Sequence, residues 1–270
     1  MRRREVITSS QNALVKRARA VRDGRQRDSI LVEGVRLCEE ALRAGLSFEA
    51  VLTTEAAVGD ARTSALLAAL EAKGAPVSLV SATLLDAVSD TKTPQGIVAL
   101  ARRPQTQGRA LPSDGKSAPL VVVLHRLNNP SNAGALLRAA EAAGATGAIA
   151  TEGTADIFSP KALRGAMGST FRLPLWTGAT FAEVVEWCAA RGVETVATDA
   201  DATRLHTELD WTLPRAVIVG TEGGGLSAEE TAAADVCVKI PMREPVESLN
   251  AAVALAVVLY EAARQRGWPR

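Results

Sequence analysis

Three adjacent glycines after a β-branched segment form a pattern that could hold a small molecule. The segment reads Val217-Ile-Val-Gly-Thr-Glu-Gly-Gly-Gly-Leu226. Glycine lacks a Cβ, so the chain can turn sharply there or let a ligand lie against its backbone. A second strand-like run ends at Pro241, and Ser248 and Asn250 then open an apolar helix whose first backbone N–H groups can bind a polar ligand. Taken alone, the glycines are equally consistent with a flexible turn between a strand and a helix.

The glycine run does not match two common nucleotide-binding motifs. A P-loop requires Lys followed by Ser or Thr after its last glycine, whereas this run continues with Leu226-Ser-Ala. The G-x-G-x-x-G spacing of dinucleotide-binding folds is also absent. A ligand held by this loop would therefore be bound in another way.

A second polar segment, Leu127-Asn-Asn-Pro-Ser-Asn-Ala-Gly-Ala-Leu-Leu-Arg138, follows the apolar strand Pro119–Leu124. Its turn formers predict that a helix begins at about Asn132 and Gly134, with Arg138 one turn inside it. Helical side chains lean toward the helix N-terminus, and ligands gather at that edge of an α/β sheet. Arg138 is therefore a candidate ligand contact, although an isolated helical arginine is more often a solvated surface residue.

These segments together resemble the signature motifs of the SpoU (TrmH-like) RNA ribose 2′-O-methyltransferases of the SPOUT superfamily. Three motifs in the right order are more specific than any one of them. They read Asn132-x-Gly134-x-x-x-Arg138, Gly220-x-Glu222-Gly223-x-Gly225-Leu226 and Ile240-Pro-Met-x-x-x-Val246-x-Ser248-Leu249-Asn250. The N-terminal part resembles the substrate-binding domain of the family, which is similar to the ribosomal-protein L30-like (L30e-like) fold, in Ser9–Lys16, Ile30–Arg36 and Thr91–Ile97.

The resemblance implies methyl transfer from S-adenosyl-L-methionine to an RNA ribose 2′-hydroxyl. It gives Arg138 the central catalytic part, contacting the target phosphate and helping to remove the hydroxyl proton. A guanidinium normally stays charged, so orienting and stabilising are its safer roles. The other implied catalytic residues are Asn132, Glu222, Ser248 and Asn250. The implied cofactor contacts are Gly220, Thr221, Glu222, Gly223, Leu226, Ile240, Met242, Ser248 and Leu249. Thr221 replaces the commoner asparagine, which should leave the backbone contacts intact.

Positive charge is concentrated at the N-terminus although the net charge is only +1. Residues 1–28 carry nine Arg or Lys against three acidic residues. Such a cluster is expected where a protein contacts phosphates, although a solvated basic helix face has the same composition. The predicted RNA contacts are Arg3, Lys16, Arg17, Arg36 and, by resemblance, Arg164. Ala166 stands where the family usually has a serine, which puts a polar contact from that position in doubt.

Alternation of helical and strand-like segments predicts an α/β protein with two domains. We expect an RNA substrate-binding domain over 1–103, a linker over 104–118 with proline, glycine and polar residues, and a methyltransferase domain over 119–270. The second domain should hold a mostly parallel sheet. Its predicted elements are strands 119–125, 146–150, 171–175, 193–197, 215–219 and 235–239, and helices 133–144, 160–167, 180–191, 227–233 and 248–265.

The last helix is too rich in small and apolar residues for a single core-facing stripe. We expect part of its surface to pack on the sheet and part on a second copy of the chain. The resemblance accordingly implies a homodimer through the SPOUT domain, and a deep trefoil knot in which the second and third motifs pass through a loop.

Other sequence features bear on the cellular location and on metal binding. There is no apolar run long enough to cross a membrane, and the N-terminal residues lack the apolar stretch of a secretory signal, which predicts a cytoplasmic protein without a membrane partner. The three cysteines are scattered and there are only two histidines, so we expect no metal site.

Two kinds of function remain open. One is an active RNA 2′-O-methyltransferase, which the presence of Arg138 favours. The other is a non-catalytic RNA-binding or ribosome-assembly factor of the same fold. Within the enzyme class, the N-terminal resemblance favours 23S ribosomal RNA over transfer RNA.

Overall fold

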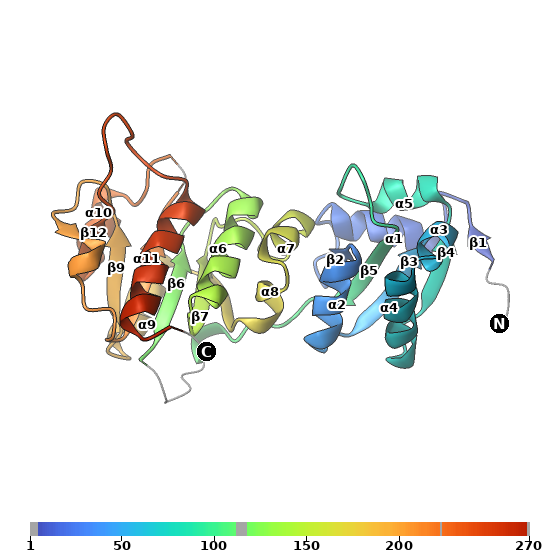
Figure 1. The fold of residues 1–270 in the computed structure, drawn as a ribbon, viewed down its shortest axis with the longest axis horizontal. Coiled ribbons are helices and arrows are strands. Elements are labelled where there is room, and N and C mark those ends of the chain that lie inside the picture. Colours follow the sequence, from blue (N-terminus) through green and yellow to red (C-terminus); the bar gives the residue numbers. More distant parts are fainter. Residues whose placement is uncertain (1–4, 112–117, 222, 269–270) are drawn as a thin grey trace. The chain divides into compact units, whose positions relative to one another are not determined.

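The computed structural model describes residues 5–111, 118–221 and 223–268 of the chain. The described residues group into two compact units. The first holds the chain up to Gln105 together with Phe158–Phe171, and the second holds Thr106–Ile157 together with Arg172–Arg270. In each unit, helices pack on a β-sheet (Figure 1).

The first unit is a mixed sheet covered by helices. Its elements are β1 (Val6–Ile7), α1 (Ala13–Arg22), β2 (Ser29–Glu33), α2 (Val35–Arg43), β3 (Phe48–Thr53), α3 (Glu55–Val58), α4 (Ala61–Ala72), β4 (Val77–Val80), α5 (Ala82–Val88), β5 (Ile97–Arg102) and α7 (Pro160–Ala166). The strand order is β1-β4-β3-β5-β2, and β5 runs antiparallel to both of its neighbours. The α/β fold predicted for the N-terminal part is confirmed.

Alternate side chains of these strands face opposite helix layers, because successive strand residues point to opposite faces of a sheet. Leu31, Leu52 and Leu100 form one buried cluster with residues of α1 and α5. The alternate residues, such as Val32 and Val51, are also buried, and α2 packs with α4. Both faces of the sheet are therefore covered.

The second unit is a seven-stranded parallel sheet. Its strands are β6 (Leu120–Leu124), β7 (Gly147–Thr151), β8 (Leu175–Ala179), β9 (Glu194–Thr198), β10 (Arg204–Leu205), β11 (Arg215–Val219) and β12 (Val236–Lys239). They lie in the order β10-β12-β9-β11-β6-β7-β8, and every pair is parallel. This confirms the predicted parallel sheet. β11 lies between β6 and β9, with which it pairs along most of its length.

Helices cover both faces of this sheet. They are α6 (Pro130–Ala142), α9 (Phe181–Ala189), α10 (Ala228–Ala233) and α11 (Ala251–Gln265), with the single turns η1 (Gly108–Ala110) and η2 (His206–Glu208). The short α8 (Ser169–Arg172) lies where the chain passes from the first unit to the second. Val121, Ile149 and Ile218 form a buried cluster with Val184 and Trp187 of α9. α6 and α11 lie side by side across the sheet (Figure 1).

α6 begins earlier than the predicted residue 133. The Asn129 side chain accepts a hydrogen bond from the Ser131 N–H at 2.9 Å and caps the helix, and Pro130 fills the first turn, where no N–H partner is needed. Asn132 therefore lies within the first turn. Arg138 lies about two turns inside α6, so the prediction of one turn is wrong.

Most other boundaries lie within two residues of the predictions, but two elements differ by more. Residues 171–175 do not form a strand, since α8 ends at Arg172 and β8 begins only after Pro174. The signal was misleading because Thr177-Gly-Ala179 in the real strand has turn-like composition. α11 begins at Ala251 instead of residue 248, because the Asn250 side chain accepts from the Ala252 N–H and caps the helix there.

The segment predicted as a linker, 104–118, is only partly described, since residues 112–117 lie outside the described chain. Residues 106–111 pack within the second unit. The Gln107 N–H donates to the Leu175 carbonyl at 2.8 Å, the Gln107 Oε1 accepts from the Leu175 N–H, and Leu111 is buried in the cluster beneath α9.

α11 has one buried stripe and one exposed apolar stripe within a single chain. Leu255, Val258 and Leu259 are fully buried. Val253 and Tyr260 are about half exposed, at 50 % and 47 %. The second buried face expected for this helix is thus not formed inside the chain. No helix among the described residues is long and apolar enough to span a membrane.

Candidate functional site

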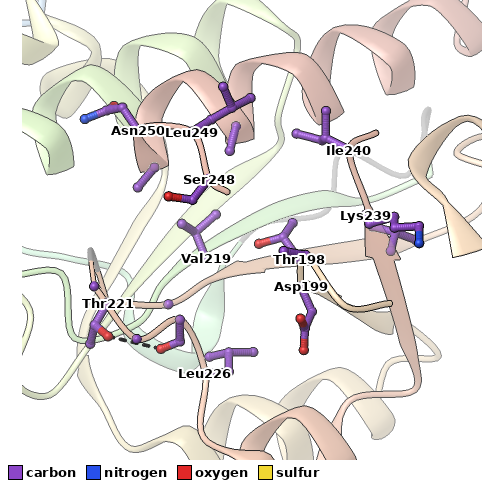
Figure 2. Close-up of a pocket in the computed structure, with 18 of the residues that line it drawn as sticks. Thr198, Asp199, Val219, Thr221, Leu226, Lys239, Ile240, Ser248, Leu249 and Asn250 are labelled. Atoms are coloured by element: carbon purple, nitrogen blue, oxygen red, sulfur yellow. Dashed lines mark hydrogen bonds between the residues drawn. The ribbon is translucent and has the colours of Figure 1, made fainter. Parts of the chain in front are cut away.

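A cavity of about 590 Å³ lies in the second unit, where the carboxyl ends of parallel strands meet. β9, β11 and β12 all end in its wall, and α6 and α11 contribute residues of their N-terminal turns. The lining residues named by the sequence analysis are Asn132, Gly220, Thr221, Gly223, Leu226, Ile240, Met242, Ser248, Leu249 and Asn250. Figure 2 shows Thr221 and Leu226 on one side of this space and Ser248 and Leu249 on another.

The loop from Gly220 to Leu226, which we call the glycine loop, is a tight hairpin. The N–H groups of Thr221 and Gly225 each donate to the other residue's carbonyl, at 3.1 and 3.0 Å, and the Thr221 hydroxyl also donates to the Gly225 carbonyl (Figure 2). A Cβ on Gly220 would lie 2.4 Å from the carbonyl group of Gly225, and Gly225 has a φ of +62°. Space thus requires glycine at Gly220, and the backbone conformation favours glycine at Gly225.

Residues of the third and first motifs contact each other at the cavity. Ser248 and Leu249 precede α11, and the Asn250 side-chain amide donates to Asn132 Oδ1 on α6 at 3.4 Å. Three of the predicted catalytic residues, Asn132, Ser248 and Asn250, therefore line one cavity. Glu222, predicted for both catalysis and cofactor binding, lies outside the described residues.

Arg138 does not line the cavity. Its side chain is exposed and makes no hydrogen bond or ion pair with any residue that the structure describes. The guanidinium is therefore available for an anionic group supplied from outside this chain.

Polar residues that the sequence analysis did not single out also line the cavity. Thr198 ends β9 and Asp199 follows it, and Lys239 ends β12 (Figure 2). The Asp199 N–H donates to the Val238 carbonyl at 3.0 Å, which joins the two strand ends. The signal that could have found them is their place at the carboxyl ends of predicted parallel strands.

The predicted RNA contacts have different surroundings. Lys16 and Arg36 are exposed, and Arg3 lies outside the described residues. Arg17 pairs with Glu49 at 2.6 Å. Arg164 pairs with Asp90 at 2.5 Å within the first unit. These two arginines already have carboxylate partners, which an RNA phosphate would have to displace or share.

A polar cluster joins the end of β6 to α10 beside the glycine loop. His125 is buried, with Nε2 3.0 Å from Glu230 Oε1 and Nδ1 3.0 Å from the Thr151 hydroxyl. The Arg126 guanidinium binds the other carboxylate oxygen of Glu230 at 2.7 Å. The Ser227 N–H also donates to Glu230, at 2.9 Å. We call His125, Arg126, Ser227 and Glu230 the α10 latch.

The pKa values of His125 and Glu230 are both lowered. Burial lowers the pKa of His125 below 6.5, against the opposing effect of Glu230. Burial acts to raise the pKa of Glu230, but hydrogen bonds from Ser227 and His125 outweigh it, so that this pKa is lowered. At neutral pH the imidazole is therefore uncharged, with Nε2–H donating to the carboxylate and Nδ1 accepting from Thr151.

Acid should destabilise the protein partly through His125. Because the pKa of His125 is lower in the folded protein than in the unfolded chain, the unfolded chain takes up the proton first as pH falls. The free energy of unfolding is therefore unaffected by His125 well above pH 6.5 and decreases as pH falls from 6.5 toward the pKa of the folded state. We expect the melting temperature to fall between pH 7 and 5, and to fall less in His125→Gln, which cannot take up the proton. Differential scanning calorimetry across this range tests the effect. Parallel pH profiles for the two proteins would show that His125 does not carry it.

No three His, Cys, Asp or Glu side chains among the described residues are grouped to hold a metal ion. The cavity instead offers backbone groups of the glycine loop, the Ser248 hydroxyl, two asparagines and apolar surface from Leu226, Ile240 and Leu249. A cavity of this size and mixed character suits an organic molecule of moderate size.

Comparison with known families divides the chain much as the two sheets do. Residues 119–260 match the SpoU rRNA Methylase family. Residues 31–107 match the RNA 2′-O ribose methyltransferase substrate-binding family.

Individual relatives match along nearly the whole chain. An uncharacterized tRNA/rRNA methyltransferase of Synechocystis sp. is 36 % identical over 96 % of this chain and 94 % of its own length. The 23S rRNA (guanosine(2553)-2′-O)-methyltransferase RlmP of Bacillus subtilis is 30 % identical over 94 % of this chain and 97 % of its own. The crystal structure of an AdoMet-bound rRNA methyltransferase from Sinorhizobium meliloti is similar at a TM-score of 0.83 and 29 % identity, covering 96 % of this chain and 97 % of that one.

Proposed function

Since the chain belongs to the SpoU rRNA methylase family, we propose that it transfers a methyl group from S-adenosyl-L-methionine (AdoMet) to a ribose 2′-hydroxyl of 23S ribosomal RNA. The family membership and the enzyme class inferred from the three motifs are confirmed. The observation that carries the proposal is that all three motifs supply residues to one cavity.

The cavity fits AdoMet in size and chemistry. Leu226, Ile240 and Leu249 provide an apolar surface for an adenine ring, and the glycine loop and Ser248 provide polar groups for the sugar and amino-acid parts. The Sinorhizobium relative, solved with AdoMet bound, supports the same ligand here. When bound, AdoMet supplies the methyl group on its sulfonium.

The reaction needs a poor nucleophile to be oriented and deprotonated. With AdoMet bound, the ribose oxygen would bond the methyl carbon as the carbon–sulfur bond breaks, S-adenosylhomocysteine would be released, and the hydroxyl proton would pass to water. We propose that Arg138 binds the target phosphate and stabilises the developing alkoxide. Its guanidinium is exposed and has no partner in the part of the chain that the structure describes, which supports this role. Asn132 and Asn250, which touch each other, would hold the ribose.

The substrate proposal follows the named relatives. RlmP of Bacillus subtilis acts on 23S rRNA and matches both halves of this chain. We propose that residues 1–103 bind the RNA, with Arg3, Lys16, Arg17, Arg36 and Arg164 among the phosphate contacts, and that the protein works in the cytoplasm. Transfer RNA remains the alternative substrate, because the Synechocystis relative is described as a tRNA/rRNA methyltransferase.

The decisive experiment is transfer of a tritiated methyl group from AdoMet to separate pools of unmodified large-subunit rRNA, small-subunit rRNA and transfer RNA. Methylated ribose protects the following phosphodiester bond from alkali. We expect label in one alkali-resistant dinucleotide from the large-subunit pool. Label in transfer RNA alone would overturn the substrate, and absence of label in every pool, with AdoMet still bound, would favour the non-catalytic RNA-binding alternative.

We also propose that the second unit, in which the family resemblance implies a trefoil knot, forms a homodimer through the exposed stripe of α11. Val253, Val257 and Tyr260 are spaced to lie on one side of the helix, and Val246 and Leu249 continue the apolar surface toward the cavity. Because Leu249 also lines the cavity, a partner on this stripe would lie beside the site.

Charge on this stripe should separate the dimer. We expect the double variant Val253→Asp and Val257→Asp to elute as a 28.2 kDa monomer in size-exclusion chromatography with light scattering, while the unaltered chain elutes at twice that mass. Ala189→Asp, at an exposed position of α9 on the other side of the sheet, is the matched control and should remain dimeric. A monomeric unaltered chain, or a dimeric double variant, would contradict this interface.

A further inference from the structure

α10 follows the glycine loop directly but has almost no apolar anchor. It spans only Ala228–Ala233, and none of its residues is buried. A helix this short is not stable by itself and needs contacts with the rest of the fold. Because no α10 residue is buried, polar contacts must hold α10 and the loop that enters it.

Glu230 makes the contacts that meet this need. Its carboxylate accepts from the Ser227 N–H and from Arg126, and lies 3.0 Å from His125 Nε2. The Glu230 backbone N–H donates to the Ser227 hydroxyl oxygen, which completes a capping box. One side chain thus holds both the start of α10 and the end of β6.

The other end of the latch is rigid. His125 is only 3 % exposed, is bonded through Nδ1 to Thr151 and packs edge-on against the Phe181 ring at 4.9 Å. Its backbone N–H donates to the carbonyl of Val219, the last residue of β11 before the glycine loop. Arg126 adopts a φ of +51°, which is unusual for a residue with a side chain and is maintained by its contacts.

We infer that Glu230 is a positioning residue that fixes the glycine loop relative to the segment carrying the first motif, through His125 and Arg126. The segment after Arg126 leads into α6 and Asn132, while Ser227 follows Leu226, so the latch connects two walls of one cavity. None of the four latch residues lines the cavity. Its effect on AdoMet binding rests on the proposed function, whereas its effect on the two loops does not.

Hydrogen–deuterium exchange of the full chain tests the inference without a ligand. We expect Glu230→Ala to speed exchange at least about tenfold both in residues 125–132 and in the glycine loop, because the backbone hydrogen bonds of both segments lose their support. Glu229→Ala removes the same charge from the neighbouring position, which is exposed and has no partner among the described residues, and should leave both segments unchanged. Unchanged exchange in residues 125–132 of Glu230→Ala would overturn the inference.

Glu230→Gln separates the latch from the helix cap. Glutamine still accepts from Ser227 but loses the charge that holds Arg126, so we expect faster exchange in residues 125–132 with little change in α10. This variant also decides the matter if Glu230→Ala does not fold. Faster exchange confined to α10 would reduce Glu230 to a capping residue.

AdoMet titration calorimetry then links the latch to the site. We expect the Kd to rise about tenfold in Glu230→Ala and to stay constant in Glu229→Ala, well below both melting temperatures. Failure of the unaltered chain to bind AdoMet would overturn the proposed cofactor while leaving the exchange result valid. Normal binding by Glu230→Ala would show that the latch does not position the cofactor wall.

Discussion

Arg138→Ala should reduce methyl transfer by roughly 10²–10⁴-fold while AdoMet binding changes by no more than a few-fold. The guanidinium is exposed, has no partner among the described residues and lies outside the cavity lining, so its loss should neither open the core nor alter the cofactor wall. The change should appear in kcat, because the proposed contact strengthens as charge develops on the ribose oxygen. Single-turnover kinetics together with AdoMet titration calorimetry would measure both quantities.

Two further arginine variants sharpen this test. Arg138→Lys keeps the charge but loses the planar fork, so it should recover only part of the rate. Arg204→Ala removes another exposed arginine of the same unit and should leave turnover unchanged. Unaltered turnover in Arg138→Ala would remove this residue from the mechanism.

Gly220→Ala should weaken AdoMet binding by at least about a hundredfold, equivalent to roughly 2.8 kcal/mol. The added methyl group would lie 2.4 Å from the Gly225 carbonyl atoms and 2.7 Å from the Leu226 nitrogen. These are backbone atoms, so no side-chain rotation relieves the contact and the hairpin must open. Isothermal titration calorimetry gives the affinity, and calorimetric melting shows whether the fold survives.

Gly224→Ala is the matched stability control within the same loop. A Cβ there would meet only the Thr221 hydroxyl, at an ordinary 3.7 Å. We expect its melting temperature to stay within about 2 °C of that of the unaltered chain, since ordinary surface changes have small effects. If Gly220→Ala bound AdoMet normally, the tight hairpin would not be needed for the site.

The sequence predicted most helices and strands, because each of them depends mainly on residues that are close together in the chain. Apolar runs and their period gave β11 at its observed boundaries, 215–219. Helix starts failed where a capping side chain decided the outcome, as at Asn129 and Asn250, whose own hydrogen bonds end the preceding loop. Very short strands such as β1 and β10 were missed because two residues carry no periodic signal.

Residue surroundings in the site were harder to predict because they depend on distant partners. Thr198 and Asp199 line the cavity only because β9 lies next to β11 and β12, an order that differs from the chain order. The carboxylates opposite Arg17 and Arg164 likewise come from remote segments of the sequence. The role proposed for Glu230 requires knowing that His125 faces it, which no spacing in the sequence indicates.

The place of β11 in the sheet has a consequence for synthesis on the ribosome. β6 and β9 are both made before β11, yet neither pairs with the other, and β11 lies between them. At about 5–20 residues per second, β6 waits roughly five to twenty seconds for this neighbour. A nascent chain that stops before Arg215 would therefore hold β6, β7 and β8 as one strand group with an open edge, whereas β9 and β10 would have no strand partner, and it would not be a smaller version of the folded domain.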